Sequence, residues 1–303
     1  MYQARRPFRN QFVPIRNLRY HVLTWGEPAP GKVPLVMVHG WMDVGASYQF
    51  VVDALHQDHY VIAPDWRGYG LTEVPPTDNY WFPDYLADLD FLIDHFSPDA
   101  PVNLVGHSMG GNVAMLYAGT RPQRIRRLVN LEGFGMPATR PAQAPGRMAK
   151  WIDEVKALHR GELALKNYDS VDGVAQRLMK TNRRLSQDKA DWLARHWARQ
   201  EADGQWHILG DPAHKIINAN LFRVDEVLEM YKGIAAPLLA VEASDDSLDG
   251  WWKGKYTLAE YHERLKAVSD MRIARVEDAG HMLHHDQPEQ LAHLIEEFLS
   301  ESA

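Results

Sequence analysis

The stretch VNLVGHSMGGNVAMLYA, residues 102–118, changes from one structural pattern to another within a few positions. Three of its first four residues are apolar and two of them β-branched, as in a buried strand, and its last part is typical of a helix. Between them lies GHSMG, residues 106–110, which has the pattern G-x-S-x-G. The sequence therefore predicts a strand, a sharp turn and a helix, with Ser108 at the turn.

A serine at such a turn is a candidate nucleophile. The central residue is forced into a strained backbone conformation, and glycines two positions on either side prevent collisions. The start of the following helix offers free backbone N–H groups to negative charge developing beside Ser108. The alternative is an ordinary Gly-Ser turn with no chemistry, and the rest of the chain has to decide between the two.

Apolar, strand-like runs alternate with amphipathic helical segments along much of the chain. Strands of this kind, buried on both faces and separated by helices, predict an α/β protein with a mostly parallel, twisted sheet flanked by helices. We expect strands at 13–24, 33–40, within 60–70, 102–107, 127–131, and in PLLAVEAS and MRIARVEDAGH, and helices at 46–56, 83–95, 109–120, 258–268 and 288–299.

Residues 137–234 differ from this alternation. They are rich in helix-forming residues, Trp, Met and Arg, and show little strand character. We interpret them as a helical cap, or lid, inserted after the sixth strand. Residues 1–136 and 235–303 would then form the α/β core together.

A serine hydroxyl needs a base to take its proton, and the sequence offers fifteen histidines. His281 follows the last predicted strand, which places it at the sheet edge expected for Ser108. His284 and His285 lie one helical turn further on, and we expect them to line the lid or support the site. The run His281, His284, His285 and Asp286 has metal-binding residue types, but a nucleophile turn needs no metal, so we predict none.

The third member of a Ser-His-acid triad orients the imidazole and stabilises its cation. Asp245 and Glu132 each follow a predicted strand. With either residue as the acid, the chain order is Ser–acid–His. We favour Asp245, although it could be a solvated loop acid. Glu132 is the alternative catalytic acid, unless it is only a buried carboxylate held by backbone N–H groups.

Two backbone N–H groups are expected to form an oxyanion hole. One belongs to Met109, directly after the serine, and the other to Trp41, because His39-Gly40-Trp41 ends an earlier strand at the same sheet edge. Gly40 would let this loop approach the substrate. His39 itself is expected to bond within the loop rather than to act as a second base.

Charge and composition exclude several kinds of function. The formal net charge is −7 and no long basic run occurs, so nucleic acid and anionic membranes are not expected partners. The absence of cysteine excludes disulfides, thiolate catalysis and Cys-ligated zinc. We find neither a signal-peptide pattern nor an apolar stretch of membrane-spanning length, so the default expectation is a cytoplasmic protein.

Four motifs in this order resemble those of the α/β-hydrolase fold superfamily: HGWMD at 39–43, APDWRGYG at 63–70, GHSMGG at 106–111 and AGHMLHHDQPE at 279–289. RLMKTNRRLSQDKADWLARHWA is similar to the cap of the serine hydrolase-like members. The resemblance implies Ser108 as nucleophile, His281 as base, Asp245 as the usual acid, and Trp41 and Met109 as oxyanion donors. Haloalkane dehalogenases of this fold, however, place a glutamate at the position of Glu132.

The resemblance also implies the chemistry. Dehalogenases and epoxide hydrolases of this fold use an aspartate nucleophile, whereas a serine implies an acyl-enzyme. We therefore expect a cofactor-free carboxylesterase acting on a small to medium, uncharged acyl ester. Carbon–carbon bond hydrolases, perhydrolases and weakly catalytic ligand-binding proteins of the same fold are the alternatives. Nothing in the sequence fixes the oligomeric state, and a homodimer through the lid or an edge element is compatible with it.

Overall fold

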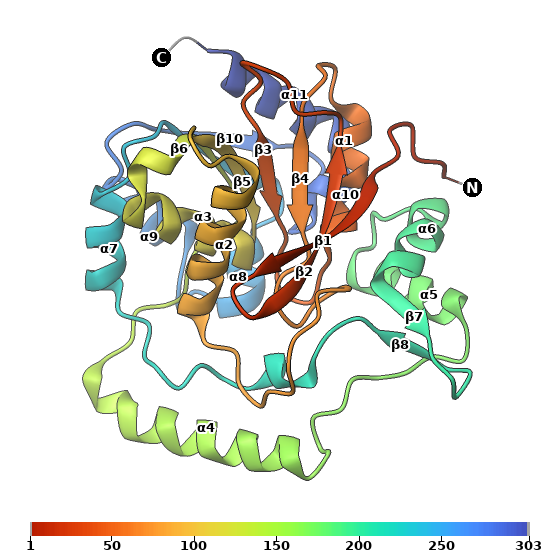
Figure 1. The fold of residues 1–303 in the computed structure, drawn as a ribbon. Coiled ribbons are helices and arrows are strands. Elements are labelled where there is room, and N and C mark those ends of the chain that lie inside the picture. The colour runs from red at the N-terminus through yellow and green to blue at the C-terminus, as the bar shows by residue number, and fades with distance from the viewer. Residues whose placement is uncertain (1, 302–303) are drawn as a thin grey trace.

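The computed structural model describes residues 2–301, and its centre is a twisted eight-stranded sheet (Figure 1). The strand order is β1-β2-β4-β3-β5-β6-β9-β10, and β2 runs antiparallel to both of its neighbours while the remaining pairs are parallel. This confirms the predicted mostly parallel sheet. The strands are β1 (Arg9–Ile15), β2 (Leu18–Trp25), β3 (Leu35–Val38), β4 (Val61–Pro64), β5 (Val102–His107), β6 (Ile125–Leu131), β9 (Leu238–Ala243) and β10 (Met271–Val276).

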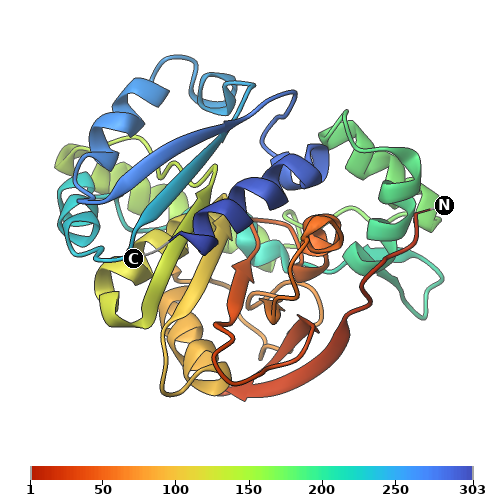
Figure 2. The ribbon, with the colours of Figure 1, turned by 90° about the horizontal axis from the view of Figure 1, so that it is seen from above.

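Helices cover both faces of the sheet (Figure 2). Side chains alternate between the faces along each strand, as the two-residue period of a strand requires. In β3, Val36 and Val38 belong to one hydrophobic core, whereas Leu35 and Met37 belong to the other. The first core contains residues of α2 (Phe82–Phe96), α3 (Met109–Thr120), α7 (Val224–Lys232) and α9 (Leu258–Leu265), and the second contains residues of α1 (Gln49–Ala54), α10 (Leu283–Asp286) and α11 (Pro288–Ser300).

The prediction of a single strand at 13–24 is wrong, because the chain reverses its direction within these residues. Residues Arg16 and Asn17 form a tight turn, with Arg16 at φ +55°, and join β1 to β2 as an antiparallel hairpin. The turn contains neither glycine nor proline, and Asn17 is the one residue in it that commonly forms turns. Pro14 is tolerated in β1 because this is an edge strand.

The segment between β6 and β9 contains mainly helices, as expected of a helical insertion after the sixth strand. A small antiparallel sheet within it was not predicted. The long helix α4 buries none of its residues and lies apart from the sheet (Figure 1), whereas α7 packs against α3. Division of the chain into domains at 136 and 234 stays a prediction. The remaining elements are α4 (Ala144–His159), α5 (Val171–Thr181), α6 (Gln187–Trp197), β7 (Ala198–Gln200), β8 (Trp206–Ile208) and α8 (Ser247–Trp252).

Two helical glycines should respond in opposite directions to replacement by alanine. A Cβ at Gly119 in α3 would overlap the carbonyl oxygen of Met230 in α7, whereas a Cβ at Gly146 in α4 meets no atom within 4 Å. We expect Gly119→Ala to lower the free energy of unfolding by about 1–3 kcal/mol, as overpacking does. Gly146→Ala should leave it unchanged or raise it by up to about 1 kcal/mol, because alanine favours a helix.

Urea unfolding followed by circular dichroism measures both changes, and each variant is the control for the other. Equal destabilisation by the two substitutions would contradict the close packing of α3 on α7.

Candidate active site

Ser108 lies at the turn between β5 and α3, as predicted, with φ +52° and ψ −115°. Few non-glycine residues adopt this strained conformation, and such residues concentrate at functional sites. The turn is held by the N–H of Ser108, which donates to the carbonyl of Leu131 at 2.8 Å. The flanking glycines are required by space: a Cβ at Gly106 would overlap the carbonyl oxygen of Gly110, and one at Gly110 that of Val38.

His281 faces this serine from the loop between β10 and α10. Its Nε2 lies 2.9 Å from Oγ of Ser108, within the range for a hydrogen bond between nucleophile and base. The Trp251 ring packs nearly perpendicular to the imidazole, with ring centroids 4.4 Å apart. One side of His281 is thus held by an aromatic contact while its Nε2 points at the hydroxyl.

Glu132 is the carboxylate that contacts the imidazole. It follows β6 with φ +55°, and its Oε2 lies 3.2 Å from Nδ1 of His281. The side chain is only 1% exposed. Two donors fix its orientation: the N–H of Ala243 donates to Oε1 at 2.8 Å and the hydroxyl of Ser247 donates to Oε2 at 2.6 Å.

This geometry corrects the preference for Asp245. The Asp245 carboxylate is 55% exposed and pairs with Arg184 of the cap segment at 2.7 Å. The hydrogen bond from Arg184 also lowers the pKa of this carboxyl. No hydrogen bond joins Asp245 to His281 in residues 2–301. The sequence does not indicate that Asp245 pairs with Arg184, because Arg184 lies about sixty residues earlier in the chain.

The two expected oxyanion donors belong to the residues that follow Gly40 and Ser108 in the chain. Gly40 approaches it closely, since a Cβ at this position would be 3.1 Å from Cβ of Ser108. Within the described part of the chain, the backbone N–H groups of Trp41 and Met109 have no hydrogen-bond partner. Both are therefore free to donate to a substrate oxygen, and their catalytic role stays a prediction.

His39 bonds within its loop, as expected. Its Nδ1–H donates to the carbonyl of Gly40 at 2.8 Å, and its Nε2 accepts the backbone N–H of Trp66 at 2.9 Å. Burial lowers the pKa of His39, which favours the neutral ring that this bonding needs. His39 therefore shapes the loop that carries Trp41.

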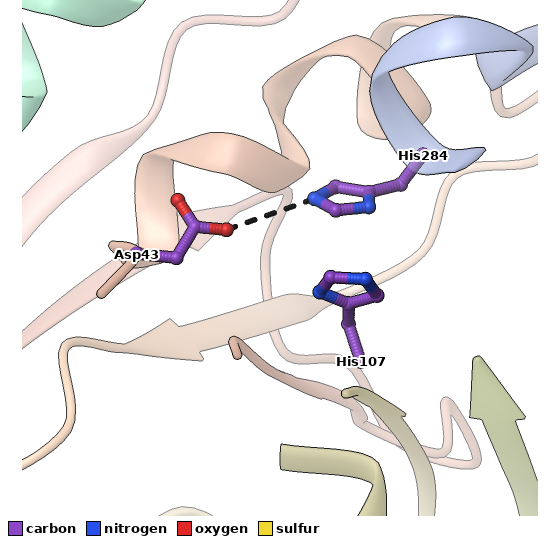
Figure 3. A group of neighbouring side chains, drawn as sticks. All are labelled: Asp43, His107 and His284. Carbon is purple, nitrogen blue, oxygen red and sulfur yellow. Dashed lines mark ion pairs between the residues drawn. The ribbon is translucent and has the colours of Figure 1, made fainter. Parts of the chain in front are cut away.

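His284 and His285 are both buried. The backbone carbonyl of His285 accepts a hydrogen bond from Lys189 of the cap segment at 3.4 Å. His284 lies beside Asp43 and His107, which sequence reasoning did not single out (Figure 3). Burial lowers the pKa of His107 well below its usual value. Burial opposes ionisation of Asp43, but its histidine neighbours outweigh this and hold its pKa at about 2.

The metal-like run read from the sequence is therefore divided in the structure. His281 faces Ser108, and Asp286 accepts hydrogen bonds from the N–H of Gly280 at 2.9 Å and from the side-chain amide of Asn182 at 2.7 Å. Asp286 thus ties α10 to the cap segment.

Comparison with known proteins agrees with this fold. A sequence profile described as alpha/beta hydrolase fold matches residues 33–288, which is most of the chain. The chain belongs to the α/β-hydrolase family.

Individual known proteins are similar to the chain in sequence or in structure. The chain is 29% identical over 292 residues to the serine hydrolase-like protein of Danio rerio, covering 95% of this chain and 86% of that protein. It is 35% identical over 106 residues to the 2-hydroxy-6-oxo-2,4-heptadienoate hydrolase of Pseudomonas putida, covering 34% and 38%. The thioesterase domain from the curacin biosynthetic pathway has a similar structure, with a TM-score of 0.80, 23% identity and coverage of 95% and 99%.

Among the described residues, no helix is both long enough and apolar enough to cross a membrane.

Proposed function

We propose that this protein is a serine hydrolase, and specifically a carboxylesterase that works through a triad of Ser108, His281 and Glu132. The observation that carries the proposal is the chain of close contacts Ser108 Oγ–His281 Nε2 and His281 Nδ1–Glu132 Oε2, at 2.9 and 3.2 Å. A hydroxyl, an imidazole and a buried carboxylate in this order activate a serine in unrelated folds.

Each residue has a definite part in the proposed reaction. His281 takes the proton of Ser108 as the oxygen attacks the acyl carbon, and Glu132 stabilises the imidazolium that forms. The N–H groups of Trp41 and Met109 bind the oxygen that becomes negative, an interaction for which one donor contributes about 10²–10³ in rate. His281 then protonates the departing alcohol and activates the water that releases the acid.

The surroundings favour an uncharged acyl group. Trp251 lies against His281, and Trp41 follows the glycine that approaches Ser108. Both indole side chains are half-exposed. Arg184, the cation nearest to the predicted acid Asp245, is already neutralised by Asp245 and Asp278. Two tryptophans next to the triad suit a small to medium, uncharged ester.

Carbon–carbon bond hydrolysis is the second candidate. It is favoured by the local similarity to the Pseudomonas putida 2-hydroxy-6-oxo-2,4-heptadienoate hydrolase. That reaction would use the same triad and would differ in the contacts to the substrate's carbonyl groups. Perhydrolysis, or slow chemistry in a ligand-binding role, would also use Ser108, so a substrate panel is needed to separate them.

The test is a panel of p-nitrophenyl esters from acetate to laurate. We expect hydrolysis of the shorter and medium esters, because their acyl groups match an uncharged, apolar site. Release of p-nitrophenolate gives kcat and KM for each chain length, and a vinylogous β-diketone tests carbon–carbon cleavage in parallel. Folded protein that hydrolyses no ester would overturn the esterase assignment, and cleavage of the diketone alone would favour the second candidate.

A further inference from the structure

Three buried polar side chains, one of them from the residue that precedes the nucleophile, form a cluster (Figure 3). His107 precedes Ser108 at the end of β5, Asp43 lies in the loop after β3, and His284 belongs to α10. Their relative exposures are 2%, 5% and 1%. The proposed esterase reaction uses none of these side chains.

Each member of the cluster has a polar atom without a hydrogen-bond partner among residues 2–301. Asp43 accepts the hydroxyl of Ser47 at Oδ1, and its Oδ2 has no hydrogen bond but forms a long ion pair, at 3.8 Å, with Nε2 of His284 (Figure 3). Nδ1 of His107 and Nδ1 of His284 are also unpartnered. Buried polar atoms are ordinarily paired, and three such atoms in one place could all be satisfied by a single bound cation.

The bonding of His107 is that of a metal-ligating histidine. Its Nε2–H donates to the backbone carbonyl of His281 at 2.8 Å, so the lone pair of the ring lies on Nδ1. Metal-bound histidines nearly always donate their other ring N–H to a carbonyl or carboxylate in this way, because the bond fixes the tautomer and the ring orientation.

We propose that Asp43, His107 and His284 bind a divalent transition metal ion, and that Zn²⁺ is the best match. The set supplies two imidazole nitrogens and one carboxylate oxygen, which are ordinary zinc ligands. One ligand atom from each residue lies within 4.8 Å of the others. Ligand atoms in a tetrahedral zinc site are about 3.3 Å apart for bonds of about 2.0–2.1 Å, so the three side chains must draw together on binding.

The position of the site connects it to catalysis, and this step rests on the proposed function. His107 holds the backbone carbonyl of His281, whose Nε2 contacts Ser108. Drawing His107 toward the metal shifts that carbonyl and lengthens the contact between base and nucleophile. We therefore expect bound Zn²⁺ to lower kcat for ester hydrolysis at least several-fold.

Zinc titration of the metal-free protein by isothermal calorimetry tests the site without any assay of activity. Wild type should bind one Zn²⁺ per chain and gain thermal stability. Asp43→Asn and His284→Gln should weaken binding by at least about 100-fold, because loss of even an outer partner of a ligand typically costs 10–100-fold. His293→Gln removes an exposed histidine and His281→Gln removes the imidazole beside Glu132, and both should still bind zinc.

Three outcomes would overturn the site: no stoichiometric binding by wild type, undiminished binding by Asp43→Asn and His284→Gln, or loss of binding in His281→Gln, which would place the metal at the triad. If both ligand variants fail to fold, the zinc anomalous signal in wild-type crystals decides, since it must lie between the three side chains. Zinc binding without any effect on ester hydrolysis would leave the site intact and overturn only its coupling to catalysis. An enzyme inactive on every ester would still show zinc binding, so the two proposals fail separately.

Discussion

Replacing Ser108 with alanine should lower kcat for ester hydrolysis by about 10⁶-fold, because loss of the nucleophile removes the acyl-enzyme route altogether. The oxygen that His281 contacts at 2.9 Å disappears, while the backbone of the turn is unchanged in its bonds to Leu131 and Asn112. Single-turnover and steady-state assays with the best ester of the panel measure the loss.

Ser300→Ala is a matched control, because Ser300 is exposed at the end of α11 and its hydroxyl donates only to the carbonyl of Glu297. It should hydrolyse esters at the wild-type rate. Thermal unfolding of Ser108→Ala should show a folded protein. If a folded Ser108→Ala variant keeps substantial esterase activity, another group performs the attack.

Replacing Glu132 with glutamine should lower kcat by about 10⁴-fold, as the corresponding change does in serine proteases. The amide loses the negative charge that stabilises the imidazolium, and its N–H₂ group can hold His281 in the wrong tautomer. The substitution is nearly isosteric, so the hydrogen bond from the N–H of Ala243 can persist at the remaining oxygen.

Asp245→Asn is the matched comparison, since Asp245 was the acid preferred from the sequence. It breaks an exposed ion pair with Arg184, a kind of interaction that contributes about 0–1 kcal/mol to stability. We expect kcat to change by less than about threefold, well under 1.4 kcal/mol in barrier. A large loss in Asp245→Asn with little change in Glu132→Gln would reverse the assignment made here.

The strand–turn–helix unit at Ser108 and the helix α3 could be predicted because their signals are local. Only glycine fits at positions 106 and 110, because a Cβ there would overlap backbone atoms. The helix α3 spans the residues predicted from the pattern. The position of His281 followed from topology alone, since parallel strands bring their carboxyl ends to one edge. The hairpin at Arg16 has only a single asparagine, Asn17, as a turn signal, and its two strands were predicted as one.

The choice of acid could not be made in the same way. Asp245 and Glu132 both follow strands that reach the same edge, so topology alone does not distinguish them. What separates them is the direction of each side chain, which depends on Ser247 and Ala243 for Glu132 and on Arg184 for Asp245. The buried cluster with Asp43 was missed for a similar reason, because its members come from three separate segments of the chain.

Mapping the site of fluorophosphonate modification by mass spectrometry tests the central claim most directly. We predict one adduct, on Ser108, formed at similar rates in wild type and Asp245→Asn and at least about a hundredfold more slowly in Glu132→Gln, since the reagent requires an activated serine. An adduct on another residue, no adduct on folded wild-type protein, or slow labelling in Asp245→Asn rather than Glu132→Gln would contradict the triad of Ser108, His281 and Glu132.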